Sequence, residues 1–368
     1  MPIGGFSLLI LFFFLSIESP KTPLLAGLRS IDWAGTFLII GGTLMFLFGL
    51  EFGGVNYPWK SATVICLIVF GVVVWALAMF AEWKLAKYPI IPPRLFNEWY
   101  NVLILMVCFC HGFVFIAGAY YLPFYFQTVL LASPILSGVY TLPMVLSLSF
   151  VSAATGIVMK KTGRYRELII GGLFFMTLGF GLFIDLKPYA SWPRIIIFQL
   201  IAGVGVGPNF QAPLVAFQAN IRPADMATAT ATFGFVRQLS TSMSVVLGTV
   251  IYQNVISGQS DKIVAAIGPE RAAAISASFA GASKELIQSL NESQRKVVLD
   301  SFTFALSRMW IFYTAVAGLG FVLSLFIVPR ELSKTHTIRK TGLEEQERAR
   351  QELIDSKRKS DGKPETEA

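Results

Sequence analysis

Residues 63–81 read TVICLIVFGVVVWALAMFA and contain no charged side chain. A run of about 20 apolar residues can cross a hydrocarbon core about 30 Å thick. Such a run must be a helix, because lipid offers no hydrogen-bond partner to a free N–H or C=O group. Similar runs predict nine spans in all, at 2–17, 31–50, 63–82, 101–121, 135–158, 168–186, 194–217, 230–256 and 308–328. The sequence therefore predicts an all-α polytopic membrane protein.

Composition agrees with this fold class. Of the residues, 54% are hydrophobic and only 14% are charged, whereas soluble domains carry about 25% charged residues. The net charge of +8 does not indicate nucleic acid, because the charge is distributed by loop. Ten Lys and Arg residues lie in the loops 18–30, 83–100, 159–167 and 218–229. The loops on the other side, 51–62, 122–134 and 187–193, hold Lys60 and Lys187 alone. This positive-inside pattern predicts a cytoplasmic C-terminus.

The spans group unevenly along the chain. We expect an orphan span at 1–17, a linker at 18–100 that carries two spans, a six-span bundle at 101–328 with an outside segment at 257–307, and a mixed-charge cytoplasmic tail at 329–368. The first run could also be a cleaved signal peptide, but it lacks basic residues before it and a small-residue cleavage site after it. A retained span is the favoured interpretation. The outside segment contains helix-forming stretches at 270–282 and 284–300, and a glycosylation sequon at Asn291.

The sequence shows no catalytic constellation, no metal-ligand spacing and no phosphate-binding loop, so neither an enzyme nor a metal or cofactor site is predicted. Cys66, Cys108 and Cys110 fall within spans, where thiols usually pack as small apolar groups. His111 is the one histidine in a span. A packed or locally bonded ring is favoured over a role in substrate or proton binding.

Uncharged polar and aromatic residues mark a candidate substrate cavity. They are Tyr120, Tyr121, Phe124, Gln127, Gln199, Asn209, Gln211 and Gln218. Amide side chains in a span either bond to neighbouring helices or line a wet cavity, and both interpretations stay open. A cavity of this kind suits a bulky amphiphilic solute, since an inorganic ion or a sugar phosphate would require fixed charge.

A second set predicts a gating region near the cytoplasmic face. It comprises Gly156, Lys160, Lys161, Gly163, Arg164, Arg166 and Arg237. Glycine permits a tight turn, and basic side chains can bond the last carbonyls of a helix. Arg237 lies inside its span, where snorkelling, a structural bond to carbonyls, or contact with substrate would explain it; the structural bond is favoured.

Glycine and proline interrupt the spans that begin each half of the six-span bundle. Pro123 ends one of them, and 203–213 contains three glycines and two prolines. Interrupted spans at matching places in two repeats are typical of transporters built from inverted repeats.

At these residues the chain resembles the fourteen-span drug:proton antiporter group of the major facilitator superfamily, which is common in fungi. The loop 156–166 looks like a degenerate copy of that family's cytoplasmic motif, and 120–139, 203–213 and 235–239 are similar to its later helices. The resemblance implies alternating access, export of a hydrophobic drug, toxin or secondary metabolite, and a proton as coupling ion. It also implies a multi-pass protein of the plasma membrane, with the vacuolar membrane as an alternative. The expected partners are the lipid bilayer and a small-molecule substrate, with no nucleic acid and an undetermined oligomeric state.

The first residues carry a further expectation. Pro2-Ile3-Gly4-Gly5 looks like the opening of the group's sixth helix. By this match the chain corresponds to helices six to fourteen, and the resemblance implies that the first five are absent. Since one bundle supplies one wall of a cavity, we expect little transport from this polypeptide alone. The alternative is a non-transporting fragment or a regulatory partner of a full-length transporter.

Overall fold

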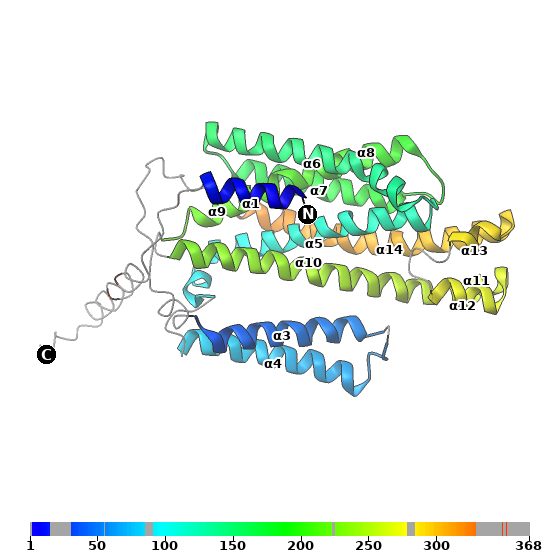
Figure 1. Cartoon of the computed structure of the whole chain (residues 1–368), viewed down its shortest axis with the longest axis horizontal. Coiled ribbons are helices and arrows are strands. Elements are labelled where there is room, and N and C mark those ends of the chain that lie inside the picture. The colour runs from blue at the N-terminus through cyan, green and yellow to red at the C-terminus, as the bar shows by residue number, and fades with distance from the viewer. Residues whose placement is uncertain are drawn as a thin grey trace, which may run out of the picture.

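The computed structural model describes residues 2–14, 31–54, 56–84, 91–222, 225–277 and 284–328, together with positions 348 and 351. Within these ranges the elements are helices, and no strand forms beyond an isolated bridge between Gly53 and Tyr57. Eight helical segments of the described chain are long and apolar enough to cross a membrane (Figure 1). The predicted all-α polytopic membrane fold is thus confirmed.

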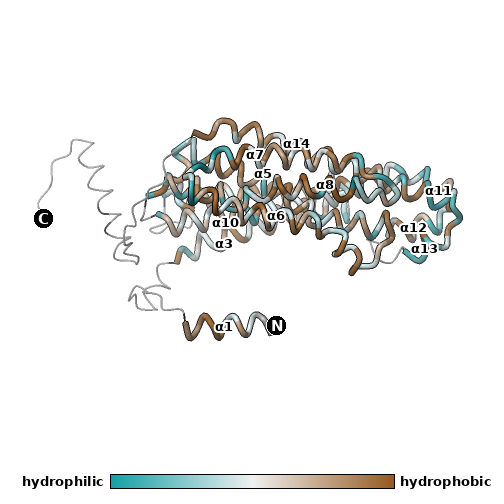
Figure 2. The backbone as a smooth tube through the Cα atoms, turned by 90° about the horizontal axis from the view of Figure 1, so that it is seen from above, coloured by the Kyte–Doolittle hydropathy of each residue, from teal (hydrophilic) through white to brown (hydrophobic). Residues whose placement is uncertain are grey.

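The first predicted span is helical as far as the structure describes it. Helix α1, Pro2–Phe14, is apolar but shorter than a full span, and positions 15–17 lie outside the described residues. It is drawn apart from the other helices (Figure 2). The span at 2–17 therefore stays a prediction. The predicted tail at 329–368 also lies outside the described residues, apart from positions 348 and 351.

Two helices of the linker form a hairpin. Helix α3, Trp33–Phe52, packs along α4, Ala62–Lys84. The backbones approach closely at Gly71, where an added Cβ would lie 2.8 Å from the backbone nitrogen of Phe46. Small residues allow such close packing between membrane helices, whose apolar side chains gain nothing by leaving lipid. The hairpin rests on the bundle through α3 and α10 (Figure 1).

The remaining long helices form one bundle. Its segments are α5 (Trp99–Thr128), α6 (Pro134–Thr162), α7 (Arg166–Leu182) with η2 (Phe183–Asp185), α8 (Trp192–Val206), η3 (Gly207–Phe210), α9 (Ala212–Gln218), α10 (Met226–Ser257) and α14 (Glu292–Leu325). Helix α5 is the central one, packed against α6, α10 and α14, and most of its side chains are buried. Helix α7 packs against α8 and α14, and α6 against α8.

The outer face of the bundle is apolar. On α6, Ile135 is 81% exposed and Phe150 is 77% exposed. An apolar surface of this extent is rare on a protein surrounded by water. It agrees with helices that contact lipid or another apolar surface.

Two helices extend furthest beyond their predicted spans. Helix α5 continues through Pro123 to Thr128, and the carbonyl of Pro123 accepts a hydrogen bond from Ser137 Oγ at 3.0 Å. Helix α14 begins at Glu292, well before the predicted span at 308–328, because the side chain of Asn291 caps it by accepting from the backbone N–H of Gln294 at 2.9 Å.

Short helices fill the chain between α10 and α14. They are α11 (Ser260–Ile267), α12 (Pro269–Ala277) and α13 (Lys284–Ser289), and they lie together at one end of the bundle (Figure 1). The predicted single helix over 284–300 is wrong in its continuity, since α13 ends at Ser289 and α14 starts a separate helix at Glu292.

An ion-pair cluster joins the segment between α4 and α5 to the bundle. This segment contains a 3-10 turn, η1, at Pro93–Phe96. Its Arg94 pairs with the buried carboxylate of Asp225 at the start of α10, and Arg222 donates to the same carboxylate at 2.9 Å. We call the end of the bundle that carries Arg94, Lys160, Lys161, Arg164 and Arg222 the basic end.

Candidate functional site

The span at 192–218 is broken inside the bundle, in the half nearer the basic end, where Gly172 of α7 lies beside Asn209. Helix α8 ends at Val206, η3 covers Gly207–Phe210, and α9 restarts at Ala212. Proline has no N–H, so Pro208 and Pro213 leave the carbonyls of the residues four positions earlier without their usual helical donors. A break inside a membrane bundle requires other donors for these carbonyls.

Side chains from three elements bond to carbonyls at the break, and one of these is the carbonyl of Asn209, four positions before Pro213. His111 Nε2 on α5 lies 3.1 Å from the carbonyl of Val206. The Asn209 side chain donates to the carbonyl of Gly205 at 3.3 Å. Arg237 Nη2 on α10 donates to the carbonyl of Phe210 at 3.0 Å and approaches that of Asn209 at 3.4 Å. The predicted structural bond of Arg237 to carbonyls is present in the structure.

Aromatic rings surround these donors. The ring centroids of His111 and Phe210 lie 5.2 Å apart, and the His111 ring stacks on Phe115 at 6.2 Å. The guanidinium carbon of Arg237 lies 5.1 Å from the centroid of the Phe233 ring and 5.7 Å from that of Phe210. Cation–π contacts therefore support a guanidinium that has no acidic partner among the described residues. We call His111, Asn209, Phe210 and Arg237 the break cluster.

The break cluster keeps unused hydrogen-bonding capacity. His111 and Asn209 are fully buried. Among the described residues, His111 Nδ1, Asn209 Oδ1 and Arg237 Nε are buried without a hydrogen-bond partner. Buried polar atoms without partners are rare in native proteins and often lie at functional positions. Sequence reasoning placed Asn209 in the cavity and Arg237 in the gate, and it treated His111 as packing, so the structure brings together residues that the sequence left apart.

The predicted amides divide by exposure. Gln199 is fully buried and donates to the carbonyl of Tyr140 on α6 at 2.9 Å. Gln218 is half-buried and donates to Thr230 Oγ1 on α10 at 3.0 Å. Gln211 is exposed beside the break. The first two make the interhelical contacts that were one interpretation of the amides, while Gln211 stays accessible.

The predicted aromatic residues at the far end of α5 also divide. Tyr120 is 43% exposed, whereas Tyr121 and Phe124 are buried. The Tyr121 hydroxyl donates to the carbonyl of Val245 on α10 at 2.6 Å and lies against Gly248, which has no side chain to occupy that space. The structure therefore directs Tyr121 toward α10 and leaves Tyr120 accessible. Gln127 is half-buried, and its amide lies 3.3 Å from Ser137 Oγ.

The different burial of Tyr120 and Tyr121 predicts different effects on stability when each hydroxyl is removed. Tyr121→Phe is expected to lower the free energy of unfolding by about 1 kcal/mol, because the Val245 carbonyl loses its side-chain donor. Tyr120→Phe should change it by less than about 0.5 kcal/mol, as substitutions of exposed groups usually do. Thermal unfolding of the two purified variants measures both values, and equal melting temperatures would contradict the assignment.

The predicted gating loop forms a tight turn at the basic end. Gly163 closes α6 with a left-handed φ of 70°, which glycine adopts without strain. Arg166, at the start of α7, donates to the carbonyl of Leu325 at the end of α14 at 3.2 Å. Lys160, Lys161 and Arg164 are exposed. Gly156 lies on α6, seven residues before Gly163, and an added Cβ there would be 3.4 Å from Gln211 Oε1.

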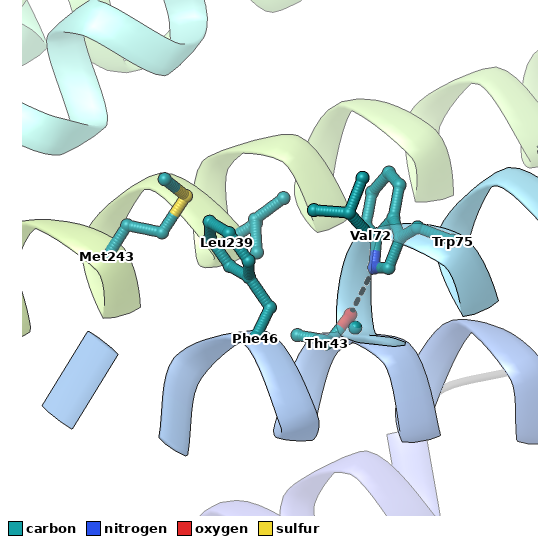
Figure 3. A pocket seen from close by; sticks show the side chains of 7 residues that line it. Thr43, Phe46, Val72, Trp75, Leu239 and Met243 are labelled. Atoms are coloured by element: carbon teal, nitrogen blue, oxygen red, sulfur yellow. Dashed lines mark hydrogen bonds between the residues drawn. The ribbon is translucent and has the colours of Figure 1, made fainter. Parts of the chain in front are cut away.

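A pocket of about 220 Å³ lies between the hairpin and α10 (Figure 3). Its lining residues are Thr43, Phe46, Gly71, Val72, Trp75, Leu239 and Met243. Its one polar pair is already satisfied, since Trp75 Nε1–H donates to Thr43 Oγ1 at 3.0 Å. Pockets for drug-sized ligands are usually larger, about 300–1,000 Å³. None of the predicted cavity residues lines this pocket.

Proline spacing was the signal that could have located the break cluster. Pro208 and Pro213 predict a break in the helix, because the carbonyls of Val204 and Asn209 lose their usual donors. The sequence does not indicate which neighbouring side chains supply the donors, because His111 and Arg237 lie 95 and 27 positions away from the carbonyls of Val206 and Phe210.

Comparison with known proteins adds an independent finding. Residues 13–169 match the fungal trichothecene efflux pump (TRI12) family. The chain is 50% identical over 349 residues to the efflux pump dotC of Dothistroma septosporum, covering 95% of this chain and 60% of that protein. It is 45% identical over 364 residues to the MFS-type transporter ppz2 of Metarhizium majus, covering 99% of this chain and 63% of that protein. The chain is 42% identical over 369 residues to an MFS-type transporter of Aspergillus terreus, covering 98% of this chain and 66% of that protein. The chain thus spans less than two thirds of the length of these curated relatives.

Proposed function

This chain is a relative of the MFS-type efflux pumps over nearly its whole length, and from that premise we propose that it takes part in the export of hydrophobic or amphiphilic small molecules by proton antiport. We place it in the fourteen-span group. Its bundle would form one wall of a cavity that opens alternately to either side of the membrane. The plasma membrane is the proposed location, with the basic end and the C-terminus in the cytoplasm.

The broken span is the observation that carries this proposal. Alternating-access transporters often build their sites from discontinuous helices, whose unwound carbonyls and half-helix ends face the transported species. Here α8 and α9 are two helical segments of one span, separated by η3 inside a six-helix bundle, with buried polar side chains at the break.

The exposure of each side chain indicates which of the predicted cavity residues could contact substrate. Tyr120 and Gln211 are exposed on the bundle, and Gln127 and Gln218 are half-buried, so we assign these four to direct contact with substrate. Tyr121, Phe124, Gln199 and Asn209 are buried and would shape the wall. Aromatic faces and uncharged amides suit a solute that is largely apolar and carries a few hydrogen-bonding groups.

The gating residues fit the same scheme. The turn at Gly163 and the bond from Arg166 to Leu325 join α6, α7 and α14 at the basic end. We propose that this junction moves as one unit when the cavity opens to the cytoplasm. Lys160, Lys161 and Arg164 would remain at the lipid headgroups, where positive charge is favoured.

Dye efflux from yeast tests the function. One strain expresses this chain, a second expresses the part of the Dothistroma pump that lies outside the aligned region, and a third expresses both. We expect the third strain alone to lower the accumulation of a hydrophobic fluorescent dye, because both walls of the cavity are then present. A protonophore should abolish the effect, since it removes the gradient that drives antiport.

Surface expression of both polypeptides is the control, measured with terminal tags. If both reach the membrane and dye accumulation stays at the vector level, the efflux proposal is wrong. A protonophore-insensitive decrease would contradict proton coupling and leave efflux in place.

A further inference from the structure

We infer that His111 and Arg237 form a proton-dependent lock on the break between α8 and α9, in which Arg237 holds the break only while His111 is neutral. The inference rests on the proposed proton antiport and deepens it, because it names the two side chains whose charges make protonation of the bundle and a held break mutually exclusive. The lock has three parts: a proton acceptor, a fixed cation and the carbonyls that the cation holds.

The acceptor is one atom of the His111 ring. A carbonyl oxygen accepts and cannot donate, so the contact with the Val206 carbonyl at 3.1 Å places the hydrogen of the neutral ring on Nε2. Nδ1 then carries a lone pair, and it is buried without a partner among the described residues. A proton that reaches the ring binds there, forms one N–H bond, breaks none, and leaves the ring with one positive charge.

The fixed cation is Arg237. Helices α5 and α10 approach closely at Gly112, next to His111, where an added Cβ would lie 3.4 Å from Arg237 Cγ. Both side chains contact the ring of Phe210. A guanidinium does not lose its proton in proteins, so the charge beside the His111 ring is permanent while Arg237 stays in place.

Other groups near the ring do not neutralise this charge. On its own helix, the titratable neighbours are the buried thiols of Cys108 and Cys110. From α14, the Tyr313 hydroxyl is already bound to the Ser244 carbonyl on α10 at 2.6 Å. In the described parts of α6, α7, α8 and α9, the charged side chains lie at the ends of the segments, and Glu167, the acidic one at the start of α7, is exposed and lies five positions before Gly172.

Charge repulsion connects the acceptor to the break. Two positive charges inside a membrane bundle repel strongly, because the surroundings screen them poorly. Protonated His111 and a bound Arg237 therefore exclude each other. Since Arg237 cannot become neutral, it must withdraw, and the carbonyls of Asn209 and Phe210 then lose their donor. Release of these carbonyls frees α9 to move relative to α8.

The chain itself offers a clean measurement. It contains two histidines, His111 and His336, so His336→Gln leaves a single imidazole. The full chain with ¹⁵N-labelled histidine, reconstituted in lipid bilayers, can then be followed by solid-state NMR between pH 8 and pH 5. In this background we expect the ring of His111 to stay neutral throughout, with its hydrogen on Nε2.

Two substitutions of Arg237 form the matched pair. Arg237→Gln removes the cation and keeps a hydrogen-bond donor, so His111 should become protonated as the pH falls through this range. Arg237→Lys keeps the charge, so the ring should stay neutral as in the parent. The lock is wrong if the glutamine variant matches the parent, or if the lysine variant behaves like the glutamine variant.

A second experiment measures how accessible the break between α8 and α9 is to a labelling reagent. Gln211→Cys provides a reporter beside the break in a chain whose three native cysteines are replaced by alanine. His111→Lys, which mimics the protonated ring, should raise its rate of maleimide labelling roughly tenfold, as a shift from mostly held to mostly released would do. His111→Gln keeps a neutral donor and should leave the rate unchanged. Equal rates in the two variants would overturn the lock.

Neither measurement requires transport. A positive NMR result with no dye efflux would support the lock and reject the proposed function, and the reverse combination would reject the lock alone.

Discussion

Gly205→Ala is expected to prevent normal packing of the bundle, although the change adds a single methyl group. A Cβ at this position would overlap the backbone nitrogen of Met176 on α7 and lie 2.5 Å from Met176 Cα. Backbone atoms cannot turn aside as a flexible side chain can, so α7 and α8 must separate along their contact. Overpacking usually costs about 1–3 kcal/mol, and we expect the upper end of this range, about 3 kcal/mol, with little monodisperse protein after detergent extraction.

Gly171→Ala is the matched control. Gly171 lies on α7, and an added Cβ there meets no atom within 4 Å. Alanine is a better helix former than glycine by about 1 kcal/mol, so this variant should be as stable as the parent or slightly more stable. Size-exclusion profiles and thermal unfolding of both variants measure their monodispersity and stability. A Gly205→Ala variant as stable as Gly171→Ala would show that α7 and α8 do not pack as described.

Arg237→Leu is expected to abolish efflux in the two-polypeptide yeast assay. The leucine cannot donate to the carbonyls of Asn209 and Phe210, which Arg237 reaches at 3.4 and 3.0 Å. Hydrogen bonds to a charged group contribute about 1.5–3 kcal/mol. Since 1.4 kcal/mol corresponds to about a factor of ten, the held form of the break should become roughly ten- to hundredfold less populated, and efflux should fall accordingly.

The control for this variant is its exposed neighbour. Gln238→Ala changes a side chain that is exposed, and it should keep the parent rate. Surface expression must be equal in both strains, so that the comparison measures transport and not abundance. Full efflux by a well-expressed Arg237→Leu variant would mean that the break is held by other contacts.

The gross architecture could be predicted from the sequence because membrane spans depend on local composition. A run such as 63–81 must be helical wherever it lies in a bilayer, since its backbone has no other partner for its polar groups. Eight of the nine predicted spans are long helices in the described chain. The boundaries were less predictable, because Pro123 is tolerated inside α5 and the side chain of Asn291 starts α14 early.

The candidate site could be predicted in part. Asn209 and Arg237 were singled out as polar residues inside spans, where burial of such groups requires a partner. His111 was assigned to packing, because one histidine in an apolar helix carries no pattern. Its partner, the carbonyl of Val206, is a backbone group on another helix, and residue types do not record which backbone atoms a side chain will meet.

The amino-acid sequence by itself determined that this chain crosses a membrane repeatedly, which loops carry positive charge, and that the predicted span at 194–217 is interrupted by Gly207, Pro208 and Pro213. These properties follow from hydropathy and from the missing N–H of proline, which act within a single segment. The tertiary structure alone decided that Tyr121 faces α10 while Tyr120 stays exposed, and that His111 and Arg237 both contact Phe210 at the break. Those outcomes depend on the rotation and spacing of packed helices, which arise from many contacts between distant segments and leave no local mark in the sequence.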